Sequence, residues 1–389
     1  TDWYGTPATD LIVRRWLDND FYVANFNVDY KKNELEVISG LSFSNYTGDH
    51  FGEVIWAKQF NPEASIRDRY YFSDAKKNEF SVFSRVSVKL NEKLSAFIDL
   101  QVRFVNYKTD GLTSDRDLLN VDKSYKFFNP KLGLTHEFNN NNSVYASYAR
   151  GNREPNRDDF KNGPNVKNEI LDDFELGYRL KNEVLNLNTN LYFMLYKNQL
   201  IQTGGLNDVG EYLRENVKDS YRLGLEVDAN IRISNSLTIN QNLTLSTNKI
   251  KNFILERDGE SKNIGTTTIA FSPSIIAANA ISYAPLKNLQ ISILSKYVGE
   301  QYLSNTDTKA SKLDSYFIND FNLTYELKTK SIFKSIIFSG LINNVLNKEY
   351  VDRGYTFLDY WSTPGSSFEV QGYYPQATRN FLIGATLKF

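Results

Sequence analysis

Apolar and polar side chains alternate along this chain with a period of two residues, and no other feature limits the fold as strongly. In residues 94–104 six apolar side chains fall on one face, whereas Asp99 and Arg103 fall on the other. Residues 223–233 divide in the same way, with Asp228 on the polar face. Such stretches are longer than most strands of soluble proteins, and their length suits tilted strands that cross a membrane.

Fifteen strands are predicted, and their connections alternate between short and long. The predicted strands cover 21–30, 34–46, 76–90, 94–107, 122–138, 143–150, 168–180, 184–200, 219–233, 237–248, 268–283, 288–303, 313–327, 334–343 and 376–389. Tight polar turns such as 91–93 and 181–183 alternate with long segments such as 151–167 and 344–375. Short turns on one rim and long loops on the other are typical of outer-membrane barrels.

The fold class predicted from these patterns is all-β, a transmembrane antiparallel β-barrel. A soluble β-sandwich also alternates, but its strands are shorter and both of its inner faces form one core. Asp, Glu, Arg and Asn on the polar faces favour a water-filled lumen instead. The mean hydropathy of −0.46 is no objection, because averaging along an alternating strand hides its apolar face.

Composition excludes several other classes of protein. The 389 residues contain no cysteine, which removes disulfide scaffolds, cysteine nucleophiles and cysteine zinc sites. A net charge of −1 gives no basic footprint for nucleic acid. His50 and His136 are unrelated in the sequence, and Asp172 and Asp173 should point to opposite faces of a strand. We therefore expect no enzyme activity, no cofactor and no metal site.

The direction of the strands suggests that the barrel is larger than this chain. If the last strand runs toward the periplasm, the alternation of turns and loops makes 21–30 run the same way. Closing the first strand on the last would then give a parallel pair, which bacterial barrels with even strand numbers avoid. Residues 1–389 are accordingly expected to be the C-terminal part of a barrel whose first strands precede Thr1.

Several segments resemble TonB-dependent outer-membrane receptors, most of all those of Bacteroidetes. The resemblance is carried by four segments, 128–134, 143–160, 340–350 and 373–389. They read FNPKLGL, SVYASYARGNREPNRDDF, GLINNVLNKEY and YYPQATRNFLIGATLKF. The resemblance covers most of the chain.

The resemblance implies a barrel of twenty-two strands around an N-terminal plug, located in the bacterial outer membrane among its lipids. The fifteen strands would be the last fifteen, and neither the plug nor the segment that contacts the TonB complex is recognisable here. The C-terminal Phe389 would be the aromatic residue that the insertion machinery of similar proteins recognises. It also continues the apolar face of the last strand.

The resemblance also implies a function: active uptake of a scarce nutrient bound by the outer loops, driven by energy from the TonB complex. Iron chelates, haem and cobalamin are the first substrate classes, and import of an oligosaccharide with a surface lipoprotein is the alternative. A passive channel without a plug and a soluble binding module are two further hypotheses. The sequence does not decide among the substrates.

Two groups of residues are candidates for ligand binding. The polar segment 151–167 includes Arg153, Arg157 and Asp158, which could contact a ligand or the plug. Mixed charges usually neutralise one another, so ion pairs that order the loop are the favoured interpretation. The second group contains the aromatic residues Tyr355, Phe357, Tyr360, Trp361, Tyr373 and Tyr374. They could stack on a ligand, although an interfacial girdle or loop packing is favoured for them.

Overall fold

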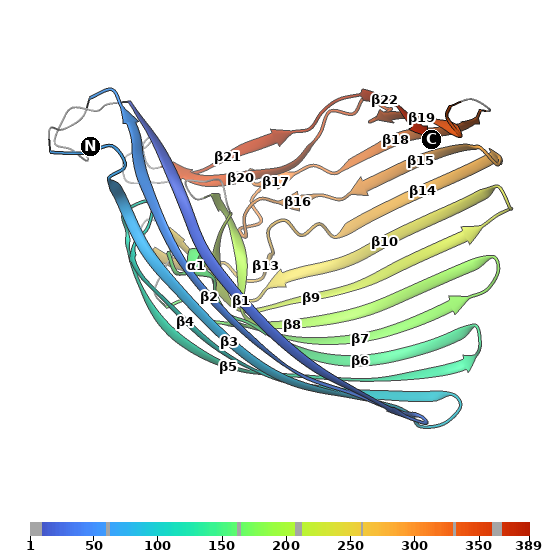
Figure 1. Ribbon diagram of the computed structural model, residues 1–389, viewed down its shortest axis with the longest axis horizontal. Coiled ribbons are helices and arrows are strands. Elements are labelled where there is room, and N and C mark those ends of the chain that lie inside the picture. The colour runs from blue at the N-terminus through green and yellow to red at the C-terminus, as the bar shows by residue number, and fades with distance from the viewer. Residues whose placement is uncertain are drawn as a thin grey trace. The chain divides into compact units, whose positions relative to one another are not determined.

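The chain forms one long antiparallel sheet with small hairpins beside it (Figure 1). The structure, a computed structural model, describes residues 10–59, 63–161, 165–206, 212–257, 260–329, 332–359 and 368–389. Fifteen strands follow one another in a single hydrogen-bonded order, and the two-residue strand β13 pairs with β10 beside them. In chain order these fifteen are β1 (Leu11–Lys32), β2 (Leu35–Ala57), β3 (Arg69–Lys89), β4 (Leu94–Leu112), β5 (Leu118–Asn139), β6 (Asn142–Arg153), β7 (Glu169–Lys181), β8 (Leu185–Leu206), β9 (Tyr212–Arg232), β10 (Leu237–Ile250), β14 (Ile275–Leu286), β15 (Leu289–Val298), β18 (Tyr316–Lys328), β19 (Ser335–Asn343) and β22 (Asn380–Lys388).

All fifteen predicted strands are confirmed, but their bounds differ from the prediction. Many are longer than the sequence pattern indicated, whereas β14 begins at Ile275 instead of residue 268, β15 ends at Val298 instead of residue 303, and β22 begins at Asn380 instead of residue 376. β8 extends to Leu206, whereas the alternation predicted an end at residue 200. About ten residues of a tilted strand cross the hydrocarbon. The strands continue past that depth, where lipid no longer imposes an apolar face, so the pattern weakens before the strand ends.

Four small strand groups and one helix lie beside the fifteen-strand order. Those at residues 254–263, 351–375 and 157–161 fall in predicted long connections, whereas those at residues 267–268, 301–302 and 312–313 overlap the ends of predicted strands. The hairpins are β11 (Ile254–Arg257) with β12 (Glu260–Asn263), β16 (Gln301–Tyr302) with β17 (Lys312–Leu313), and β20 (Val351–Asp359) with β21 (Phe368–Pro375). The remaining elements are β13 (Thr267–Thr268) and the helix α1 (Arg157–Lys161). Within the described residues, no helix is long and apolar enough to cross a bilayer.

Asparagine side chains shape three of the short turns. Asn91 Oδ1 accepts hydrogen bonds from the backbone N–H of Lys93 and Leu94, both at 2.9 Å. Asn182 Oδ1 likewise accepts from the N–H groups two and three residues further along the chain. Asn139 Oδ1 accepts from the N–H of Asn141. An Asn side chain that bonds its own backbone two residues on favours a tight turn. These turns therefore fix the register of the hairpins that they join.

The chain divides into two compact units. The first comprises Thr1–Val88, Phe97–Leu132 and Arg150–Asn168, and the second comprises Lys89–Ala96, Gly133–Ala149 and Glu169–Phe389. In the second unit β8, β9, β10, β14 and β15 lie side by side, coloured green to orange in Figure 1.

Cross-strand register in the second unit confirms the two-faced pattern. Leu225 pairs with Leu191 on one side and with Leu245 on the other, and all three remain exposed. One row of opposite parity pairs Asp228 with Asn188 and Asn242. One face of this wall is thus apolar and exposed, as lipid requires, and the other is polar.

Candidate functional site

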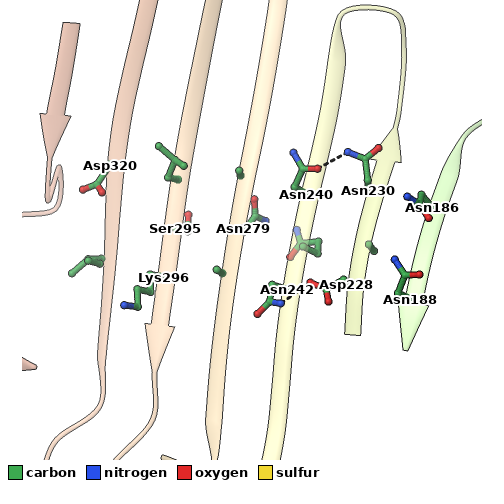
Figure 2. A pocket seen from close by; sticks show the side chains of 16 residues that line it. Asn186, Asn188, Asp228, Asn230, Asn240, Asn242, Asn279, Ser295, Lys296 and Asp320 are labelled. Carbon is green, nitrogen blue, oxygen red and sulfur yellow. Dashed lines mark hydrogen bonds between the residues drawn. The ribbon is translucent and has the colours of Figure 1, made fainter. Parts of the chain in front are cut away.

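A shallow hollow of about 560 Å³ lies on the polar face of the second unit (Figure 2). Asn186 and Asn188 border it on β8, and Asp320 borders it on β18. Between them the small side chains of Ala278 and Ala280 leave room. We name this feature the luminal hollow.

Amide groups dominate the luminal hollow. Asn242 Nδ2 donates to Asp228 Oδ1 at 2.6 Å, and Asn230 Nδ2 donates to Asn240 Oδ1. Lys296 contributes the positive charge. Amides both donate and accept hydrogen bonds, so this wall suits water, a polar solute or a polar protein surface.

At the end of the strands joined by long connections, the second unit has a small hydrophobic core of its own. We name it the outer core; its buried members are Ile201, Val217, Ile250, Phe253 and Ile269. Asn305 ties three segments together above it. Its Oδ1 accepts from the Ala270 N–H at 2.8 Å, and its Nδ2 donates to the Gln202 carbonyl at 2.9 Å.

Gly204 allows two of these segments to approach closely. Its φ of +92° lies in the region that favours glycine, and a Cβ there would stand 2.2 Å from the Leu303 carbonyl oxygen. Leu303 is completely buried, and Tyr212 Oη donates to the Gly354 carbonyl at 2.7 Å. The hairpins at this end are therefore packed against one another like a small soluble domain.

These segments line a partly open cavity of about 420 Å³, which we name the outer cavity. Side chains from β8, β9, β11, β20 and β21 line it, together with Ser304, Asn305 and Thr306. Phe253 and Phe357 give it two aromatic surfaces. A cavity of mainly apolar wall with a few polar groups is typical of small-molecule sites.

The charges of the outer cavity are Glu215, Glu256, Glu369 and Arg257. Arg257 Nη2 stands 3.9 Å from Glu369 Oε2, too far for a hydrogen bond. Arg257 Nε and Glu369 Oε1 are buried and have no partner among the described residues. Each of these unpaired atoms keeps its desolvation cost in the structure as described.

No group of three or more His, Asp or Glu side chains within the described ranges is arranged to hold a bare metal ion. The three carboxylates and single guanidinium of the outer cavity also make it net acidic. The chemistry that fits is a neutral or cationic ligand with several hydrogen-bonding groups.

In the first unit, the segment that follows β6 is held by an ion-pair network. Lys77 Nζ stands 2.6 Å from Glu154 Oε1, and Arg103 Nη2 stands 3.4 Å from the same oxygen. Arg103 in turn donates two hydrogen bonds to Glu79, at 2.8 and 3.0 Å. Burial is the largest single influence on Glu154 and acts to raise its pKa, but hydrogen bonds from Lys77 and the backbone, together with the charges of Lys77 and Arg103, outweigh it and hold the pKa below its ordinary value.

The helix α1 is capped and anchored by its own residues. Asn156 and Asp159 exchange hydrogen bonds between side chain and backbone at 2.8 and 2.9 Å, which caps the first turn. Arg157 Nη2 donates to Ser73 Oγ at 2.7 Å. Phe160 stacks on Tyr107 at a ring-centroid distance of 5.9 Å and packs with Leu119 and Val121.

The candidate residues of segment 151–167 accordingly lie in an ordered structure. Arg153 ends β6, and Arg157 and Asp158 begin α1. Asp158 pairs with Lys161 at 3.0 Å, so the pairing favoured from the sequence is present here. A role of Arg153, Arg157 or Asp158 in ligand binding stays a prediction.

The aromatic candidates lie on the hairpin β20–β21, which pairs apart from the main sheet. Tyr355 contacts Tyr374 at 5.8 Å, and Arg353 lies 5.4 Å from the Tyr374 ring. Tyr373 borders a second depression of about 480 Å³. Tyr360 and Trp361 lie outside the described residues. Packing within the hairpin β20–β21 thus explains the positions of the Tyr355 and Tyr374 rings.

The sequence analysis missed the charged pair of the outer cavity. Arg257 and Glu369 lie in two different connections, and neither belongs to a motif. Phe389 is exposed and contacts Phe333 at 5.0 Å. Its role as an assembly signal stays a prediction.

Comparison with known proteins identifies relatives of the fold. The family profile described as TonB dependent receptor-like, beta-barrel, matches residues 1–345. A search among curated proteins found no match.

Three solved structures illustrate the likeness. The ferric-catecholate import receptor Fiu of Escherichia coli K12 is 15% identical with a TM-score of 0.67 over 97% of this chain and 55% of its own. The siderophore receptor PiuA of Acinetobacter baumannii is 18% identical with a TM-score of 0.69 over 95% of this chain and 56% of its own. The ferric yersiniabactin uptake receptor FyuA of Yersinia pestis is 15% identical with a TM-score of 0.68 over 97% and 55%. This chain therefore spans about half the length of these receptors.

Proposed function

Since the chain belongs to the TonB-dependent receptor β-barrel family, which resides in the bacterial outer membrane, we propose that it is the wall and ligand-binding part of a nutrient importer. The outer cavity binds the nutrient, and energy from the TonB complex drives its release toward the periplasm. The observation that supports this most is the outer cavity, which is built on its own core beyond the membrane-spanning segments.

A metal chelate is the first substrate class that we propose. The three solved relatives are named as receptors for ferric-catecholate, siderophore and ferric yersiniabactin. Because the outer cavity is net acidic, a neutral or cationic chelate suits it better than a polyanionic one. Haem and cobalamin belong to the same proposal, since each would arrive as a complete metal complex. The attribution to Bacteroidetes stays a prediction.

An oligosaccharide is the second candidate, and one observation favours it. A sugar hydroxyl donates to a carboxylate and accepts from a guanidinium, and Glu369 Oε1 and Arg257 Nε are atoms of these two kinds that have no hydrogen-bond partner among the described residues. Phe253 and Phe357 could pack against a sugar ring. A surface lipoprotein would then be the partner that presents the glycan.

The test uses the full-length receptor in a strain that lacks it, with and without an intact TonB complex. Uptake of radioactive iron from a panel of chelates is compared with growth on a panel of oligosaccharides. We expect TonB-dependent uptake of one class, reduced by Glu369→Ala and Arg257→Ala, whereas Glu183→Gln in a short turn leaves it unchanged. Passage that persists without TonB, together with a large open-pore conductance, would establish a passive channel instead.

A further inference from the structure

Two carboxylates of the outer cavity have no partner of their own. Glu215 lies on β9 and Glu256 lies on β11, and both line the cavity. Both side chains are exposed, and neither makes an ion pair or a hydrogen bond to a described residue. Glu369 differs, because its Oε2 stands near Arg257 and accepts a hydrogen bond from Thr306 Oγ1 at 3.4 Å. The guanidinium of the cavity thus stands beside Glu369, and the other two carboxylates lack a counter-ion among the described residues.

Glu215 is accessible and yet closely surrounded by protein. Burial, and after it the negative charge of Glu256, raise the pKa of the Glu215 carboxyl. No positive side chain of the described residues offsets these two effects. A carboxylate that is both accessible and surrounded lies on the wall of a cavity, where a solute can reach it.

Three incompletely partnered carboxylates in one cavity cost the free receptor stability. Glu215 and Glu256 repel each other and keep part of their desolvation cost. The side chain of Glu369 is only 10% exposed, and its Oε1 has no partner among the described residues. Residues that cost stability in this way are expected where a ligand binds. A cation that enters the cavity would relieve the repulsion.

The rest of the cavity wall suits an organic cation better than a bare metal ion. No three acidic or histidine side chains of the described ranges are arranged to coordinate a metal. Leu206, Leu213 and Phe357 give the cavity apolar surface. The charge of an ammonium group is attracted by carboxylates and by an aromatic face, while the carbon atoms beside it pack on apolar side chains.

We propose that the outer cavity binds an organic ammonium group of the transported nutrient, held by Glu215 and Glu256. This inference rests on the proposed import function, because it specifies the chemistry of the nutrient. An iron chelate with a free amine and an amino sugar share this chemistry. Arg257 remains beside Glu369, so it leaves Glu215 and Glu256 to the ligand.

Labelling of single cysteines measures the charge of the cavity, because residues 1–389 contain no cysteine. Leu213→Cys places a thiol on the cavity wall two residues from Glu215, and Leu118→Cys, at an exposed position where β5 begins, is the control. The full-length receptor in outer membranes is treated with methanethiosulfonates that carry either a trimethylammonium or a sulfonate group. We expect the cationic reagent to be favoured about tenfold more in the cavity than at the control.

The double variant Glu215→Gln with Glu256→Gln should remove that preference at Leu213→Cys and leave the control unchanged. Glutamine removes the repulsion between the two carboxylates, so the receptor still folds, as its heat-modifiable gel band would show. A preference for the cationic reagent that persists in the folded double variant would overturn the proposal.

Protection from labelling tests binding itself. Phenylethylammonium is added before a neutral maleimide, and its N-acetyl derivative is the matched neutral probe. We expect saturable protection of Leu213→Cys by the ammonium alone, and loss of that protection in the double glutamine variant. Equal protection by the two probes, no protection by either, or protection that survives the double variant would contradict the proposal.

Uptake separates this inference from the import proposal and distinguishes the two sources of the ammonium group. Iron uptake from a ferric trihydroxamate with a free primary amine is compared with uptake from its N-acetyl derivative. Growth on a glucosamine oligosaccharide is compared with growth on its N-acetyl form. A TonB-dependent preference for the free amine that is lost in the double variant would support both proposals and identify the source.

Two other outcomes tell the proposals apart. Equal TonB-dependent use of the free and acetylated members of a pair would overturn the ammonium inference and leave import standing. Protection by phenylethylammonium without TonB-dependent uptake of any nutrient in the panel would support the ammonium site and count against import alone.

Discussion

The membrane wall and the outer core of the second unit are ordered by different physics. The wall has no interior: Leu191, Leu225 and Leu245 face outward, and the alternation of side chains alone separates lipid from water. The outer core buries Ile250 and Phe253 as a soluble domain does. Sequence periodicity consequently describes the wall well, whereas the outer end depends on contacts between distant segments.

The largest effect that separates the two regions is expected from Phe253→Ala. Truncating a buried Phe lowers the free energy of unfolding by about 3–5 kcal/mol, and here we expect only the outer core to be destabilised. Hydrogen exchange should show faster opening at Ile250 and Ile269, while denaturation of the wall in detergent is unchanged. Ile254→Ala, at an exposed neighbouring position, is the control. A parallel loss of wall stability would show that the two regions unfold together.

Val227→Arg tests the stability of the wall instead of the outer core. A charge on the lipid face near mid-strand is expected to lower the free energy of unfolding by about 2–4 kcal/mol. Asp228→Asn, on the polar face of the same strand, should be nearly silent. Urea titration of the receptor in lipid vesicles measures both variants. Equal effects at the two positions would mean that the faces are assigned the wrong way.

Gly204→Ala tests the close approach at the outer end. The positive φ and the nearby Leu303 carbonyl should make alanine cost about 1–3 kcal/mol locally. Gly205→Ala is a matched control, because a Cβ there finds its nearest neighbour at 3.5 Å. Limited proteolysis of the outer hairpins compares the two, and equal sensitivity would contradict the strain argument.

The smallest effect is expected at Glu154 in the first unit. The pKa of Glu154 is lowered in the folded state. Its contribution to stability is therefore present when the pH is above the ordinary pKa of 4.5, and it is lost as the pH falls through the lowered pKa. Glu154→Gln should cost about 1 kcal/mol at neutral pH, after allowance for partial exposure. Protease cleavage of segment 151–167 across the pH range measures this. Asp158→Asn removes the more exposed ion pair with Lys161, so its cleavage profile should match that of the parent.

The difference between the wall and the outer core also explains which features could be predicted from the sequence. Every wall strand was predicted, because lipid on one side and water on the other impose a local pattern. The pairing of Arg257 with Glu369 was missed because the two residues are more than a hundred positions apart in the chain. The hairpin β20–β21 was missed because lipid imposes no alternation on a segment that pairs apart from the wall. Gln241 and Asn279 are each unremarkable in their own strands, and only the cross-strand register places them side by side.

Every wall strand from β2 to β19 pairs with the strand that precedes it and the one that follows it in the sheet order. Each hairpin can therefore close by itself over a short stretch of chain, with Asn91, Asn139 and Asn182 starting three of the reversals. Assembly needs no distant segment to arrive before the next hairpin is added.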